Sequence, residues 1–174
     1  MADIEAVQTM APVTLHQLPA QQGRFGAARK SGWACGDAPY LTWFDPDDRY
    51  PPQSAATFLQ QAANIMQQNP AMACVCSAEQ QITSQGRPLA FPCLDDPDVS
   101  AVRARPSALH GLLLWRRSVV DAFAAAIDGS DRIAEWRLLL DAIDGGHGYQ
   151  RLPIIARHWR QHCSQSHRAI PLPR

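Results

Sequence analysis

Apolar residues recur along this 174-residue chain in two kinds of spacing. Short runs rich in aromatic, branched or small apolar side chains, such as residues 40–44, predict strands. In residues 53–68, Phe58, Leu59 and Met66 recur at the spacing that places them on one face of a helix. The predicted strands are residues 13–18, 40–44, 72–77, 111–115 and 152–159, and the predicted helices are residues 27–35, 53–68, 118–129 and 131–144.

The order of these elements predicts an α/β domain in which helices cover a mixed sheet. Residues 84–88 have the composition of a turn. Residues 90–107 are rich in Pro and Asp and show no period, so we expect an irregular loop there. The length suits one domain with a substantial core.

Charge and hydropathy exclude several classes of protein. The chain carries 16 basic and 16 acidic side chains, so it lacks the basic footprint of a nucleic-acid-binding protein. Its apolar runs are too short to span a bilayer. The first ten residues have neither the basic nor the apolar region of a secretory signal, and we therefore expect a cytoplasmic protein.

The five cysteines do not form a recognisable framework. Their number is odd and no Cys-x-x-Cys pair occurs, which argues against both a disulfide scaffold and a structural zinc site. Cys74 and Cys76 are two residues apart in a predicted strand and would share one of its faces. We expect them to be buried structural thiols, since free cysteine packs as a small hydrophobe.

Three acidic residues follow the apolar run at 40–44. Asp45, Asp47 and Asp48 would lie at the carboxyl end of the predicted strand, which is where open α/β sheets bind ligands. Carboxylates are the hard oxygen ligands that Mg²⁺ or Mn²⁺ prefers, and such a metal ion could hold a diphosphate. The same Asp-Pro-Asp-Asp sequence is also ordinary turn chemistry, so both interpretations stay open here.

Five segments occur in an order that is typical of one enzyme family. They are "GRFGAARKSGW", "APYLTWFDPDDRYPP", "GLLLWRRSVVDAF", "IAEWRLLLDAI" and "WRQHCSQS". In this order they resemble the family 2 glycosyltransferases, in which an Ala-Arg-Asn motif precedes Asp-x-Asp-Asp, Arg-Arg, Glu-Asp-x-x-Leu and a late Arg-x-His. The resemblance covers Gly23 to Ser166 and implies the GT-A fold, a Rossmann-like mixed sheet flanked by helices.

The resemblance implies a metal-dependent site for a nucleotide-sugar donor. Asp45 and Asp47 match the Asp-x-Asp pair that binds Mg²⁺ or Mn²⁺ together with the donor diphosphate. Asp48 would support this pair or contact the sugar. Arg160 and His162 match the late Arg-x-His, which lies near the donor phosphates in such enzymes.

The resemblance also implies a catalytic base. Glu135 falls where the family has its catalytic carboxylate, which in an inverting mechanism takes the proton of the attacking acceptor hydroxyl. The acceptor would be a saccharide or a lipid-linked molecule. Arg29 matches the Arg of Ala-Arg-Asn and is assigned to the donor diphosphate. The sequence departs from the family pattern at Lys30, which replaces Asn, and at Ala134 and Glu135, which replace Glu-Asp.

The family's front portion, with its first two strands and the acidic residue that binds the nucleotide, has no counterpart in the resemblance. Residues 1–174 would then be a single, partial, N-terminally truncated domain. We expect such a domain to leave a sheet edge exposed, and a second copy or a partner chain would complete the sheet.

Simpler interpretations stand beside these roles. Glu135 near a helix start is favoured by the helix macrodipole whatever else it does. Trp136 fits the core better than a sugar-binding platform, and Arg160 and His162 would fit a solvated strand face. As a whole, the chain could also be an inactive remnant that serves as a binding or scaffold module. A phosphate-handling enzyme on an unrelated α/β fold would explain Asp45 and Asp47 alone.

Overall fold

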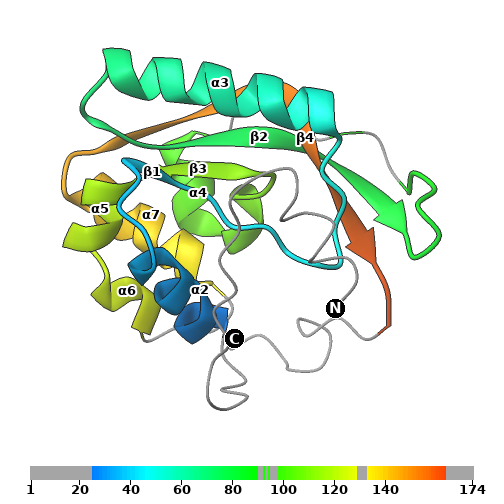
Figure 1. The fold of residues 1–174 in the computed structure, drawn as a ribbon, viewed down its shortest axis with the longest axis horizontal. Coiled ribbons are helices and arrows are strands. Elements are labelled where there is room, and N and C mark those ends of the chain that lie inside the picture. Colours follow the sequence, from blue (N-terminus) through cyan, green and yellow to red (C-terminus); the bar gives the residue numbers. More distant parts are fainter. Residues whose placement is uncertain (1–24, 90–91, 93, 95–97, 129–132, 164–174) are drawn as a thin grey trace.

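The computed structural model describes residues 25–89, 92, 94, 98–128 and 133–163, which form an α/β fold (Figure 1). The predicted strand at 13–18 lies outside these residues. The helices are α2 (Phe25–Ala34), α3 (Pro52–Gln68), α4 (Val99–Ala104), α5 (Arg117–Ala122), α6 (Ala125–Asp128) and α7 (Ala134–Asp144). The strands are β1 (Tyr40–Leu41), β2 (Met72–Thr83), β3 (Leu113–Arg116) and β4 (Gly148–Gln161).

The strands form one mixed sheet in the order β1-β3-β2-β4. Strand β3 is antiparallel to both β1 and β2, whereas β2 and β4 run parallel over most of their length. The parallel pair is irregular near Ser77 and Ala78, where the register shifts. The α/β class and the mixed sheet predicted from the sequence are thus confirmed.

Helices cover both faces of the sheet, as Figure 1 shows, with α3 on one side and α4 to α7 on the other. Alternation along the strands explains these layers, because successive side chains point to opposite faces. Cys74 and Cys76 of β2 are fully buried on the α7 face, as predicted, while Val75 between them is buried against α3. Trp115 of β3 is also fully buried on the α7 face.

Helix α3 lies where its apolar spacing predicts. Pro52 stands at its first position, where the missing N–H costs nothing, and Phe58 and Met66 are fully buried against the sheet. Arg116 binds the end of α3 and the start of β2: its Nη2 donates to Met66 O in the last turn of the helix and to Asn69 O at 3.0 Å, and its Nε donates to Met72 O at 2.9 Å. Arg116 therefore fixes the end of a helix.

Several element boundaries differ from the prediction. The strand predicted at 40–44 is confined to Tyr40–Leu41, since Trp43 packs edge-on against Trp115 and the chain then leaves the sheet. The loop predicted at 90–107 contains α4. Asp98 begins this helix by accepting the N–H of Ala101 at 2.7 Å.

Other differences lie in element length. The helix predicted at 118–129 is divided into α5 and α6, and the strand predicted at 72–77 continues to Thr83. Strand β4 extends well beyond both ends of the predicted 152–159. Within the described residues, no helix combines the length and the apolar character needed to cross a membrane.

Candidate functional site

The acidic residues lie on a loop that is fastened to the far half of β4. The N–H of Asp48 donates to Asp45 O at 3.2 Å, which closes a tight turn, and the N–H of Asp45 donates to the Tyr50 hydroxyl at 2.8 Å. Arg49 and His158 exchange two backbone hydrogen bonds, of 3.1 and 2.7 Å. The loop thus reaches β4, which is remote from β1 in the sheet order.

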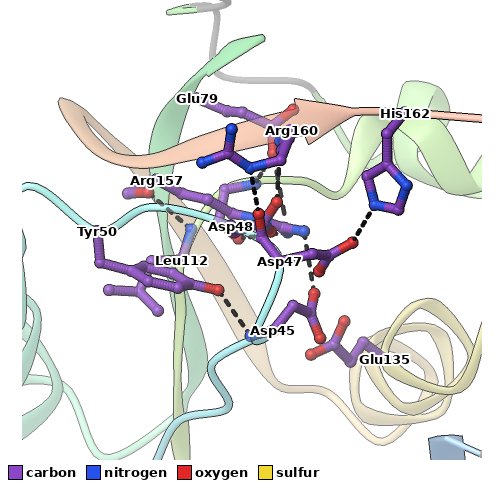
Figure 2. Close-up of polar contacts among 12 residues, drawn as sticks. Asp45, Asp47, Asp48, Tyr50, Glu79, Leu112, Glu135, Arg157, Arg160 and His162 are labelled. Carbon is purple, nitrogen blue, oxygen red and sulfur yellow. Dashed lines mark hydrogen bonds and ion pairs between the residues drawn. The ribbon is translucent and has the colours of Figure 1, made fainter. Parts of the chain in front are cut away.

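Arg157 of β4 supplies the counter-charge for this loop (Figure 2). Its Nε lies 2.6 Å from Asp48 Oδ2, and its Nη2 lies 3.0 Å from Asp45 Oδ2. Its Nη1 donates to Gly111 O at 3.3 Å and lies 3.8 Å from Glu79 Oε2. One guanidinium group therefore contacts four residues from three separate segments of the chain.

Burial shapes the electrostatics of this cluster. The side chains of Asp48 and Glu79 are 1% and 5% exposed, and desolvation raises the pKa of both, against the attraction of Arg157. Burial opposes the charged form of Arg157, but the three carboxylates around it outweigh burial and raise its pKa. Burial also raises the pKa of Tyr50 to about 12, so its hydroxyl is neutral.

Arg29 joins the acidic loop to Glu135. Its Nη2 lies 3.2 Å from Asp45 Oδ1, and its Nη1 lies 3.3 Å from Glu135 Oε2. Arg29 projects from α2, and Glu135 lies in the first turn of α7. The guanidinium also lies over the ring of Trp43, 5.8 Å from its centroid. Asp45 and Glu135, chosen from separate motifs, thus belong to one site.

Asp47 faces the end of β4 and its neighbours. His162 Nε2 lies 3.0 Å from Asp47 Oδ2, and Figure 2 shows the two side chains turned toward each other. Arg160 binds the same loop, because its N–H donates to Asp48 Oδ1 at 2.9 Å and its Nε donates to Asp47 O at 2.7 Å. The alternating pair Arg160 and His162 therefore packs on the acidic loop, which argues against a purely solvated strand face.

All the predicted site residues lie in one hydrogen-bonded and ion-paired network. They are Arg29, Asp45, Asp47, Asp48, Glu135, Arg160 and His162. Sequence reasoning missed Arg157, Glu79 and Tyr50. A charged residue inside the apolar run 152–159 was the one signal for Arg157.

Some carboxylates of the network are candidate ligands for a divalent metal ion. In the part of the chain that the structure describes, no three His, Cys, Asp or Glu side chains are grouped to hold a metal ion. Mg²⁺, however, commonly takes one or two protein carboxylates and completes its shell with water and phosphate oxygens. Asp45 and Asp47 are 31% and 42% exposed on the same loop. These two carboxylates would be the protein ligands of such an ion.

The Asp45 carboxylate already has partners within the chain. Both oxygens of Asp45 are engaged, one by Arg29 and one by Arg157, so a metal ion would share this carboxylate with guanidinium groups.

A small open pocket of about 60 Å³ lies beside Glu135, lined also by Pro106, Leu109, Ile133 and Trp136. Trp136 is fixed there by its Nε1, which donates to Val102 O at 2.6 Å.

Sequence comparisons add no family assignment. The sequence matches no family model, and a search of curated proteins finds no significant match.

Proposed function

We propose that this site transfers a sugar from a nucleotide-diphosphate sugar to a hydroxyl group of a saccharide or lipid-linked acceptor, with inversion, as in the family 2 glycosyltransferases. The observation that carries the proposal is the Arg29 bridge, with 3.2 Å to Asp45 and 3.3 Å to Glu135. A donor-binding carboxylate and a base must lie close together, since the acceptor attacks the carbon that bears the diphosphate. The mixed sheet flanked by helices is compatible with a Rossmann-like fold, the wider class to which the GT-A fold belongs.

Glu135 is the general base of the proposed reaction. It would accept the proton of the acceptor hydroxyl as that oxygen attacks the anomeric carbon. Arg29 Nη1 lies 3.3 Å from Glu135 Oε2, and Glu135 stands in the first turn of α7, so the carboxylate is held at the edge of the network. The open pocket beside Glu135 is where the acceptor hydroxyl would approach this carboxylate.

The acidic loop binds the donor in this proposal. Asp45 and Asp47 would hold Mg²⁺ or Mn²⁺, and that ion would neutralise the charge that develops on the departing diphosphate. Asp48 supports the loop through Arg157 and the N–H of Arg160. His162 Nε2 lies 3.0 Å from Asp47 Oδ2, so the imidazole would stand beside the proposed diphosphate. Arg160 adds positive potential at the same end of β4.

A second candidate function is a binding or scaffold module derived from such an enzyme. The observation that favours it is the engagement of both Asp45 oxygens by Arg29 and Arg157. A carboxylate whose charge is already balanced within the chain needs no metal ion for stability. In this alternative the network would fix the loop against β4 and would take no part in chemistry.

Release of the nucleotide diphosphate tests the proposal. A panel of UDP- and GDP-sugars would be incubated with the protein, Mn²⁺ and simple glycosides as acceptors. We expect release with at least one donor, and Glu135→Gln should abolish it while it leaves binding of the diphosphate intact. Asp141→Asn is the matched control, because Asp141 is an exposed carboxylate on the same helix. No release from any donor would favour the scaffold function, and full release by the Glu135→Gln variant would remove Glu135 from the mechanism.

A further inference from the structure

Arg157 contacts more of the site than any single motif in the sequence suggests. It lies in β4 and binds Asp45 and Asp48 of the acidic loop, Gly111 just before β3, and Glu79 of β2. Its own side chain is 16% exposed. The guanidinium therefore links the acidic loop to three neighbouring segments of the sheet from a nearly buried position.

The relative orientation of Asp45 and Asp48 depends on the planar shape of the Arg157 guanidinium group. Nε is directed at Asp48 and Nη2 at Asp45, at 2.6 and 3.0 Å, so one planar fork binds two carboxylates of the same loop. A lysine ammonium carries the same charge but has no fixed fork, and it cannot hold two carboxylates in a set relative orientation. Asp45 presents its other oxygen to Arg29, 3.2 Å away. The orientation of Asp45 toward Glu135 is thus set from β4.

We infer that Arg157 is a positioning residue of the proposed transfer site. It aims the Asp45 carboxylate at the Arg29 bridge and holds Asp48 beneath the loop, while it balances the buried charge of Glu79. The inference rests on the proposed function for its consequence, which is tighter binding of the donor diphosphate. Its structural part, the orientation of the loop, stands on the contacts alone.

Two variants separate positioning from mere stability. Arg157→Lys keeps the charge and loses the fork. Arg157→Gln combined with Glu79→Gln removes the arginine together with one buried carboxylate that it neutralises, which reduces the buried charge left without a partner. Arg87→Gln, at an exposed arginine on the turn after β2, serves as the matched control.

The first readout is amide hydrogen exchange, which needs no ligand. We expect the Asp48 and Arg160 amides, which donate to Asp45 O and Asp48 Oδ1, to exchange faster in both Arg157 variants while the amides of α3 and β2 stay protected. Unchanged exchange of the Asp48 and Arg160 amides in both variants would overturn the inference whether or not the protein binds a nucleotide.

The second readout is the affinity for UDP or GDP with Mn²⁺. Loss of a group that orients a ligating carboxylate typically weakens binding by about 10–100-fold, and we expect that range for both variants. Wild-type binding with equal binding by the variants would overturn the positioning role and leave the proposed function standing. Failure of the wild-type protein to bind either nucleotide would overturn the proposed function and with it the binding consequence, and amide exchange would then decide the orientation of the loop.

Discussion

Asp45 and Glu135 are joined by one guanidinium group. Arg29 places Nη2 3.2 Å from the first carboxylate and Nη1 3.3 Å from the second. The two acids come from a loop after β1 and from the first turn of α7, so the fold brings together residues that are remote in the sequence. This relationship gives the site its proposed division into a donor side and an acceptor side.

The Arg29 bridge predicts a loss of activity when the guanidinium is removed. Arg29→Met keeps much of the side-chain volume but leaves Asp45 and Glu135 without their shared counter-charge. We expect sugar transfer to fall by about 10–100-fold, as for other groups that orient a reacting carboxylate. Initial rates with a fixed donor would measure the change. Equal rates for Arg29→Met and for an Arg87→Met control would show that the bridge has no part in turnover.

Two glycines with positive φ differ in how closely the surrounding structure packs against them, which predicts different costs of substitution by alanine. Gly111 has φ of +90°, and an added Cβ would lie 2.2 Å from Ser77 O. Gly146 has a similar φ of +85° with nothing within 4 Å. Gly146→Ala should therefore cost about 1–2 kcal/mol of unfolding free energy from backbone strain alone. Gly111→Ala should cost more than twice as much, because Ser77 in β2 must also move.

Denaturant unfolding of both variants checks this prediction. The Gly111 variant should also disturb the site, since the N–H of Gly111 donates to Glu79 Oε2 at 3.2 Å and its carbonyl accepts from Arg157. Equal destabilisation by the two substitutions would mean that the segment before β3 can move away from Ser77 at little cost.

The regular elements were predictable because burial follows the periodicity of the sequence. Helix α3 shows this most clearly, since the residues at helical spacing are those that pack on the sheet. Strand β4 was predicted too short because the charged residues Arg151 and Arg160 flank its apolar run, and their partners lie in distant parts of the chain. Helix α4 was missed because it depends on a cap by Asp98 and on one buried side chain, Val102.

The candidate site was predictable where its residues stand in recognisable motifs. This holds for Asp45, Asp47, Asp48 and Glu135 and equally for Arg29, Arg160 and His162. Arg157 was not predicted, because its role follows from the pairing of β2 with β4 and from the path of the acidic loop. The spacing of residues along the sequence does not predict that Glu79 and Asp48 contact the same guanidinium group.

Glu79 predicts a pH dependence of stability. Burial raises its pKa above the ordinary value of 4.5, so the folded state holds this proton more tightly than the unfolded state does. The tighter proton binding stabilises the folded state fully below about pH 4.5, and this stabilisation is lost as the pH rises through the folded-state pKa. The loss is about 1.4 kcal/mol for each unit by which the folded-state pKa exceeds the unfolded-state pKa. Glu79→Gln lacks this loss and keeps an oxygen that can accept the Gly111 N–H.

Melting temperatures from pH 4 to pH 7 would measure this dependence. The difference between Glu79→Gln and the wild type should move in favour of the variant as the pH rises. Asp48 also has a raised pKa, but it is present in both proteins and cancels to first order in the difference. The opposite trend would mean that attraction by Arg157 outweighs burial at Glu79.

The central claim is that the acidic loop binds a diphosphate together with a divalent metal ion, and thermal unfolding with UDP or GDP and Mn²⁺ tests it most directly. A ligand at about 100 times its dissociation constant stabilises the folded state by about 2.7 kcal/mol, which corresponds to a rise of about 5–10 °C for a chain of this size. We predict such a rise for the wild type and for Asp37→Asn, which alters an exposed carboxylate outside the network. Asp47→Asn should abolish it. No shift in the wild type with either nucleotide, or an undiminished shift in Asp47→Asn, would contradict the account.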